Sequence, residues 1–411
     1  MEQVNQTQVT EKLDNIDIKA LSIRQLAILV FIVSLGAKFF TLPILMMKMG
    51  GRVAWVALLA LLVIDILVIA AFSVASRKSP DKTAFSIIEE TLGRIGSRII
   101  FIAIFVLLAF RAIMLFGDIA QFFSRNIFDG LPNWILLLPV VILCISFGSK
   151  SLRSLGRTSE ILIFFIVPAI IVVFLLLLKT SNWVRLLPLV GEGSTVDIWH
   201  MLTKLPLFFF DVIALFVALG KINRKAGEKE KVSSRGDKVS SASIKQKRFG
   251  FVPIISVAIA STIIFVLFLG VFSSYMDVKT VINPQEIGSL THTAISRFSF
   301  GRFDIIALVV MMAGVLLTLG VVFYSLTNTA SYIIKSSKKT PIALVLAAAV
   351  YLFVVLMNPI VLNEFILKYG IYFAGILGGG FIVILIICSV ISNKKISKEV
   401  AIDGEQNQEV G

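Results

Sequence analysis

The stretch from Leu26 to Met49, LAILVFIVSLGAKFFTLPILMMKM, decides the fold of this chain. It is long enough to cross a bilayer, because a spanning helix needs about 20 apolar residues. Lys38 lies near its middle, between Gly36 and Pro43. A charge at that depth costs at least ~2.5–3.5 kcal/mol and usually faces a cavity or a partner, and Gly and Pro weaken the helix beside it. The stretch therefore predicts a membrane helix that is interrupted at Lys38.

The composition of the whole chain indicates a polytopic membrane protein. Of its 411 residues 57% are hydrophobic, and the mean hydropathy is +0.94, whereas soluble domains contain about 45–50% apolar residues. Cys144 and Cys388 lie in apolar runs and form no disulfide or zinc pattern. The sequence contains no nucleotide-binding loop, metal cluster or catalytic triad, so we expect no enzyme, no metal and no cofactor. The first 20 residues lack a signal-peptide pattern, and insertion is expected to begin with the first helix.

Ten apolar segments are candidate spans of a hydrocarbon core about 30 Å thick, although the fourth is short. They lie near 26–49, 53–74, 98–123, 134–148, 159–178, 200–220, 250–275, 303–328, 341–358 and 370–392. Of the 39 lysines and arginines, 27 fall on the side of the N-terminus and 10 on the opposite side, while Lys38 and Arg111 lie within spans. This asymmetry predicts that both termini are cytoplasmic. It also explains the net charge of +14 better than binding of nucleic acid does.

The segments outside the spans complete the predicted organisation. We expect a cytoplasmic segment 1–25, a membrane domain 26–392 and a polar cytoplasmic tail 393–411. Residues 81–95 and 284–299 predict amphipathic surface helices on the inner and outer sides. Residues 221–248 are basic and rich in Lys and Ser, which predicts a disordered cytoplasmic loop, either solvated or held by anionic membrane lipid.

Ten spans with both ends inside divide into two halves of five, and the second half then has inverted topology. The first span of each half is interrupted: span 1 at Lys38, and span 6 at Pro206 and Asp211. Interrupted helices at corresponding positions of inverted halves indicate a binding site near the membrane midplane. The alternative is that both prolines only kink packed helices.

Four ionisable residues are predicted deep in the membrane: Lys38, Asp65, Arg111 and Asp211. Two are basic and two acidic, so they are able to neutralise one another. Asp118 follows Arg111 by seven residues and lies on the same helical face, nearer the outer surface. One interpretation is a structural network that joins spans 1, 2, 3 and 6. The other is a ligand or ion pathway, favoured for Lys38 and Asp211 because they lie at the interruptions.

The run Gly36–Pro43, GAKFFTLP, resembles the first-span signature of amino-acid/polyamine/organocation transporters, with Lys38 in place of the second glycine. Within that superfamily the chain resembles the spore-germination permeases, the B-type subunits of nutrient germinant receptors. Further stretches that carry the resemblance are Leu21–Gln25 (LSIRQ), Arg157–Ile161 (RTSEI), Leu186–Gly193 (LLPLVGEG) and Arg302–Asp304 (RFD). The chain departs from the family at Phe208–Asp211, FFFD, where the family has Pro-Phe-Gly-Glu.

The resemblance implies an all-α membrane protein of LeuT type, a 5+5 inverted repeat of ten transmembrane helices with helices 1 and 6 interrupted. It also implies a nutrient sensor in the spore inner membrane beside A-type and C-type receptor subunits. A small zwitterion, an amino acid, would place its carboxylate near Gly36–Lys38 and its ammonium near the carbonyls of Phe208–Phe210, with Asp211 nearby. The residues expected to bind it are Gly36, Ala37, Lys38, Thr41, Phe208, Phe210 and Asp211.

Two other functions fit the same composition. One is a secondary transporter of an amino acid or a cation. The other is a structural scaffold with a degenerate pocket. The phenylalanine at position 210 is the feature that supports this alternative. Within the network of spans 1, 2, 3 and 6, the sequence singles out Lys38 for contact with either the ligand or Asp211.

Overall fold

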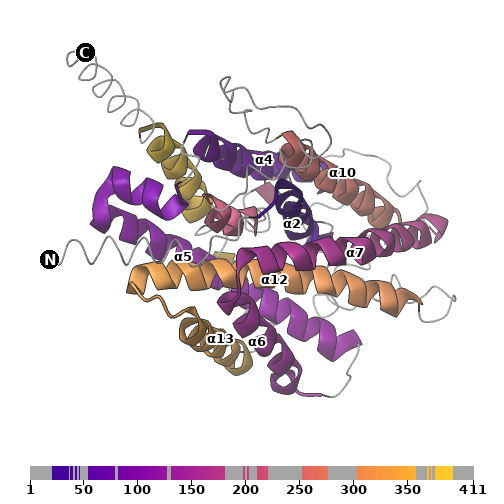
Figure 1. Cartoon of the computed structure of the whole chain (residues 1–411). Coiled ribbons are helices and arrows are strands. Elements are labelled where there is room, and N and C mark those ends of the chain that lie inside the picture. Colours follow the sequence, from indigo (N-terminus) through magenta and orange to yellow (C-terminus); the bar gives the residue numbers. More distant parts are fainter. Residues whose placement is uncertain are drawn as a thin grey trace, which may run out of the picture.

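The structure is a computed structural model of the whole chain (Figure 1). The part that it describes comprises residues 21–36, 38–39, 42–43, 46, 54–78, 82–126, 131–180, 198–199, 201–202, 211–220, 252–275, 303–357, 368–369, 372 and 375–391. The predicted tail, the basic loop 221–248 and the outer helix 284–299 lie outside these residues, as does nearly all of the N-terminal segment.

Every regular element of the described residues is a helix. The elements are α2 (Ile23–Gly36), α4 (Ala54–Lys78), α5 (Ala84–Asn126), α6 (Asn133–Ser149), α7 (Leu152–Thr180), the 3₁₀ helix η4 (Asp211–Ala218), α10 (Val252–Tyr275), α12 (Phe303–Ile334) and α13 (Lys339–Leu356). Six helices are long and apolar enough to cross a membrane, and shorter apolar helices include α2, α6 and Gly375–Ile391. Each of the ten predicted spans therefore contains one described helix.

α5 joins two elements that the sequence predicts separately. Its first part lies within the predicted amphipathic segment 81–95, where Thr83 caps the helix by accepting a hydrogen bond from the backbone N–H of Ser86 at 3.2 Å. Gly93 then has φ +72° and ψ 178°, so the helix axis turns there before the predicted third span begins. Glycine alone adopts this region without steric cost, which explains how the chain turns between the two helical parts of α5.

The start of α2 is fixed by a capping box. Ser22 Oγ accepts from the N–H of Gln25, and Gln25 Oε1 accepts from the N–H of Ser22, both at 3.2 Å. Gln25 also donates to Glu160 Oε2 of α7 at 3.1 Å. The Leu21–Gln25 and Arg157–Ile161 stretches, which the sequence comparison selected separately, are therefore in contact.

The described helices pack in two groups, one of which contains the central helix α12 (Figure 1). α5, α6, α12 and α13 all contact one another, and we call them the α12 group. α10 packs on α2 and α4, and η4 contacts α2 and α4; these four form the α10 group. The groups meet where α12 contacts α2 and η4 and where α5 contacts η4, while α7 lies against both.

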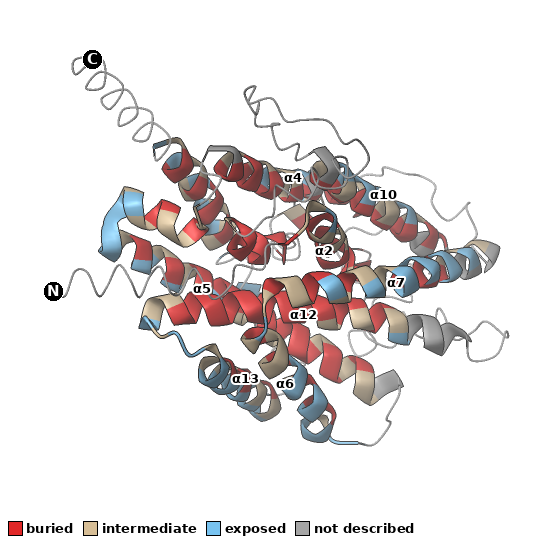
Figure 2. Ribbon diagram, viewed as in Figure 1, coloured by how far each residue is buried: buried red, intermediate tan, exposed pale blue. Residues whose placement is uncertain are grey.

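Burial follows this arrangement. α12 is buried along most of its described length, whereas α6 and α13 expose apolar side chains on the outside of the bundle (Figure 2). Exposed residues such as Ile142, Val345 and Leu352 are what a lipid-facing surface requires. The interior therefore lies along α12, between the two groups.

Candidate functional site

The four intramembrane charges predicted from the sequence come together as two ion pairs. Lys38, two residues beyond α2, donates to Asp65 Oδ2 of α4 at 2.6 Å. Arg111 of α5 donates from Nη2 to Asp211 Oδ2 of η4 at 2.7 Å and from Nε to Asp211 Oδ1. All four residues are between 1% and 4% exposed. The structure thus pairs span 1 with span 2 and span 3 with span 6, and we call these four residues the charge cluster.

The partner of Lys38 in the structure is not the protein residue that the sequence singled out for it. The sequence singled out Asp211 as its possible protein partner, but the carboxylate that accepts its hydrogen bond is Asp65. Asp211 instead binds the guanidinium of Arg111 through both of its oxygens. Such a bidentate pair is stronger and more directional than a single ammonium contact. Asp118, half-buried on α5, also acts electrostatically on Arg111.

The two pairs have different positions in the fold. Lys38–Asp65 lies within the α10 group, whereas Arg111–Asp211 joins α5 of the α12 group to η4 of the α10 group. A buried ion pair adds little net stability, because desolvation of the two charges offsets their attraction. Removal of one partner is nevertheless costly. The charge cluster therefore constrains which arrangements of the two groups are allowed, more than it stabilises the fold.

η4 lies at the C-terminal end of the predicted interruption of span 6, whose earlier residues lie outside the described part of the chain. Its residues form a 3₁₀ helix that begins at Asp211, where the sequence places the break. Ser325 of α12 donates its hydroxyl to the Ala214 carbonyl of η4, so α12 satisfies a backbone group of this tighter helix. Pro206, Phe208 and Phe210 lie outside the described residues, and so do Ala37 and Thr41; their roles stay predictions.

Gly36 has a packing role that the sequence did not indicate. A Cβ at this position would lie 2.7 Å from the Gly314 carbonyl oxygen and 2.9 Å from Thr318 Oγ1, both of α12. The backbones of α2 and α12 therefore approach closely through Gly36 and Gly314, as small residues allow in membrane helices. This contact joins the α10 group to the α12 group directly beside Lys38.

We expect Gly36→Ala to lower the unfolding free energy by about 1–3 kcal/mol, because the added methyl meets backbone atoms that cannot move aside. The measurement is thermal or denaturant unfolding of the detergent-solubilised chain. Gly270→Ala on α10 is the matched control, because a Cβ there has no atom within 4 Å. Equal stability of the two variants would contradict the close contact.

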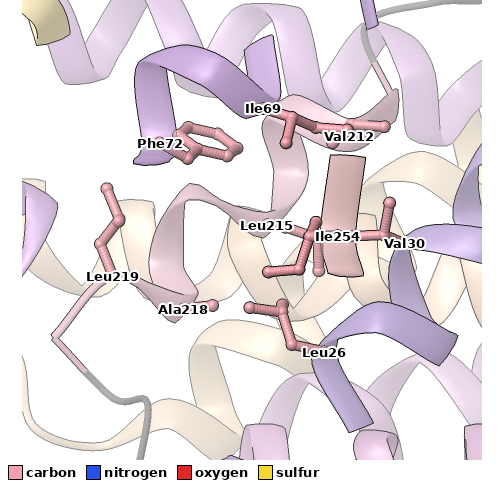
Figure 3. A pocket seen from close by; sticks show the side chains of 9 residues that line it. All are labelled: Leu26, Val30, Ile69, Phe72, Val212, Leu215, Ala218, Leu219 and Ile254. Atoms are coloured by element: carbon pink, nitrogen blue, oxygen red, sulfur yellow. The ribbon is translucent and has the colours of Figure 1, made fainter. Parts of the chain in front are cut away.

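Two small cavities lie near the charge cluster, and both are lined by apolar groups. The first lies between α2, α4, η4 and α10 and has a volume of about 20 Å³, little more than one water molecule needs. Figure 3 shows that all nine side chains around it are apolar, among them Val30, Phe72 and Leu215. The second, about 10 Å³, adjoins Gly36 and Phe39. Neither has room for an amino acid.

Phe39, the residue after Lys38, is buried against α10. Its ring makes edge-on contacts with Phe265 and Phe268 of α10, at centroid distances of 5.6 and 4.7 Å. Phe39 is not among the residues that the sequence predicts to bind the ligand, which include Phe208 and Phe210 of span 6. Its position directly after Lys38, in the family signature, was the available signal.

A comparison with solved structures identifies the class of protein. The chain is similar to a Na⁺-coupled sialic acid symporter, solved in a substrate-bound outward-open state, with a TM-score of 0.52 and 12% identity over 88% of this chain and 78% of the symporter. A manganese transporter mutant from Eremococcus coleocola has a TM-score of 0.46 and 10% identity, over 90% and 85% of the respective chains. The described residues form the nine helices named above and the apolar helix Gly375–Ile391, and the chain is a membrane protein of the LeuT-type transporter fold.

The sequence also identifies the family. The family described as "Spore germination protein" matches residues 20–236, more than half of the chain, and the chain belongs to this family. The matched region contains all four residues of the charge cluster. A search of curated proteins found no match.

Proposed function

We propose that this chain is the nutrient-sensing subunit of a spore germinant receptor. It binds a small zwitterion, an amino acid, at the charge cluster, and the bound state triggers germination. The observation that carries the proposal is that a member of the spore germination family keeps two buried ion pairs in a transporter fold, and that one of them, Arg111–Asp211, joins the two helix groups. Ionisable residues at such a place mark ligand or ion sites by default.

The mechanism follows from the position of Arg111–Asp211 across the two groups. A zwitterion that enters between the groups brings a carboxylate and an ammonium, and both interact with the charges of the cluster. The arrangement of the groups that accommodates the ligand is thereby favoured. A ligand shifts this equilibrium only by its difference in affinity for the two arrangements, and a change from 1:99 to 99:1 needs about 5.5 kcal/mol.

The proposal includes location and partners. The chain lies in the spore inner membrane with both termini in the cytoplasm, beside A-type and C-type receptor subunits that respond to the change between the groups. The family membership and the excess of basic residues on one side of the spans support this placement.

The rival function is secondary transport of an amino acid or a cation, which the fold of the sialic acid symporter favours. Two measurements separate the functions: germination of spores that lack the chain, and uptake of labelled amino acid into proteoliposomes that contain it. We expect loss of the response to at least one nutrient and no concentrative uptake. Concentrative uptake together with normal germination would establish the transporter instead.

A further inference from the structure

We infer that Asp65 recognises the ammonium group of the nutrient through its Oδ1 atom, with the Ser34 hydroxyl as a second contact. This inference rests on the proposed function and names the part of the ligand that the charge cluster selects. It also changes the orientation expected from the sequence, which placed the ammonium near Asp211.

The first observation is that the two buried carboxylates differ in how many of their oxygens accept a hydrogen bond. Both oxygens of Asp211 accept hydrogen bonds from Arg111. Asp65 accepts from Lys38 through Oδ2 only, and its Oδ1 has no hydrogen-bond partner among the described residues although the side chain is 1% exposed. An unpaired carboxylate oxygen at such depth is costly. It is therefore the acceptor of the cluster that is available to a ligand.

The second observation is the hydroxyl of Ser34 in α2, four residues before Lys38. Ser34 is 2% exposed, and its Oγ also has no partner within the described part of the chain. Several other buried hydroxyls bond a carbonyl of their own helix, as Ser261 does with Ala258 at 2.8 Å and Ser274 with Val271 at 2.7 Å. Ser34 lacks this usual bond, and it precedes by four residues the lysine that donates to Asp65.

Charge balance decides what binds there. The cluster has two positive and two negative residues and is neutral as a whole. A bare cation at Asp65 would leave one net charge buried in the membrane, at a cost of several kcal/mol. A zwitterion adds no net charge: its ammonium donates to Asp65 Oδ1, and the positive charge of Lys38 attracts its carboxylate. The chemistry thus selects an amino acid with a free α-ammonium group over an inorganic cation.

The test compares an amino acid with its desamino analogue, in which hydrogen replaces the ammonium. The full chain in lipid nanodiscs is titrated with each of the twenty amino acids, and the analogue of the tightest binder follows. We expect the wild-type chain to bind the amino acid at least about 10-fold tighter than the analogue. Asp65→Asn lowers the affinity for the amino acid about 10-fold or more and changes that for the analogue less than about 2-fold.

Ser34→Ala is the second variant, because it leaves both ion pairs intact and keeps the test valid if Asp65→Asn does not fold. We expect it to lower the amino-acid affinity about 3-fold or more, with no comparable loss for the analogue. Ser261→Ala, which removes a buried hydroxyl that is bonded within its own helix, is the matched control and leaves both affinities unchanged.

The outcomes separate this inference from the proposed function. Equal losses for the amino acid and its analogue, in both variants, overturn the role of Asp65 while the chain remains a nutrient-binding protein. If NaCl or KCl stabilises the chain more than choline chloride does, and if this stabilisation requires Asp65, the inference is overturned in favour of a cation site. No binding of any amino acid by the wild-type chain overturns both.

Discussion

Replacing Arg111 with methionine is expected to lower the unfolding free energy of the chain by about 3–5 kcal/mol, because the variant leaves the Asp211 carboxylate buried without its cation. Asp211 is 2% exposed, so water cannot take over the role of the guanidinium without a local opening of the fold. Methionine keeps the length and much of the volume of the arginine stem, so the loss reports on charge rather than on a cavity. Denaturant unfolding in detergent, followed by helical circular dichroism, measures it.

The double variant Arg111→Met/Asp211→Leu provides the control for this prediction. It removes both charges, and we expect it to regain most of the lost stability, because a buried pair contributes little beyond the penalty of breaking it. The two substitutions should therefore be strongly non-additive. A double variant that is no more stable than Arg111→Met would show that Asp211 does not depend on Arg111 for its burial.

Replacing Lys38 with methionine is expected to abolish the nutrient response of spores. The change removes the cation that binds the ligand carboxylate, and it also leaves Asp65 Oδ2 without the bond it accepts at 2.6 Å. Germination is followed by the fall in optical density after nutrient is added, and the amount of chain in the spore membrane is measured in parallel.

The double variant Lys38→Met/Asp65→Leu separates an effect on stability from an effect on ligand recognition, because it removes both charges of the pair. We expect it to be inserted in the membrane at the wild-type level. We expect this double variant to stay unresponsive. Lys150→Met is the matched control, because Lys150 is exposed at the end of α6. Normal germination of the double variant with every nutrient would show that the Lys38–Asp65 pair takes no part in sensing.

Much of the fold is predictable because the bilayer imposes it. A helix must be about 20 apolar residues long to cross the hydrocarbon, and a charge inside needs a partner, so hydropathy finds the spans and Lys38, Asp65, Arg111 and Asp211 stand out. The interruption at Asp211 was visible for the same reason. Local chemistry also predicted the helix within 81–95, although its continuity with the third span depends on the backbone conformation of Gly93.

The pairing within the site was not predictable from the sequence. Two cations and two carboxylates allow more than one neutral arrangement, and the choice depends on how each helix is tilted and rotated about its axis. The contact between Gly36 and Gly314 likewise depends on how two helices that are far apart in the sequence are positioned along their axes. The unpaired oxygens of Ser34 and Asp65 appear only when their neighbours are placed.

The most direct test of nutrient sensing is whether an amino acid binds the wild-type chain in a lipid membrane. Thermal unfolding in nanodiscs, with each of the twenty amino acids in turn, measures it. A ligand at 100 times its Kd stabilises the folded state by about 2.7 kcal/mol, so we expect at least one amino acid to raise the unfolding temperature by several degrees, and the Lys38→Met/Asp65→Leu variant to lose that increase. An unfolding temperature that no amino acid changes would contradict the proposed function.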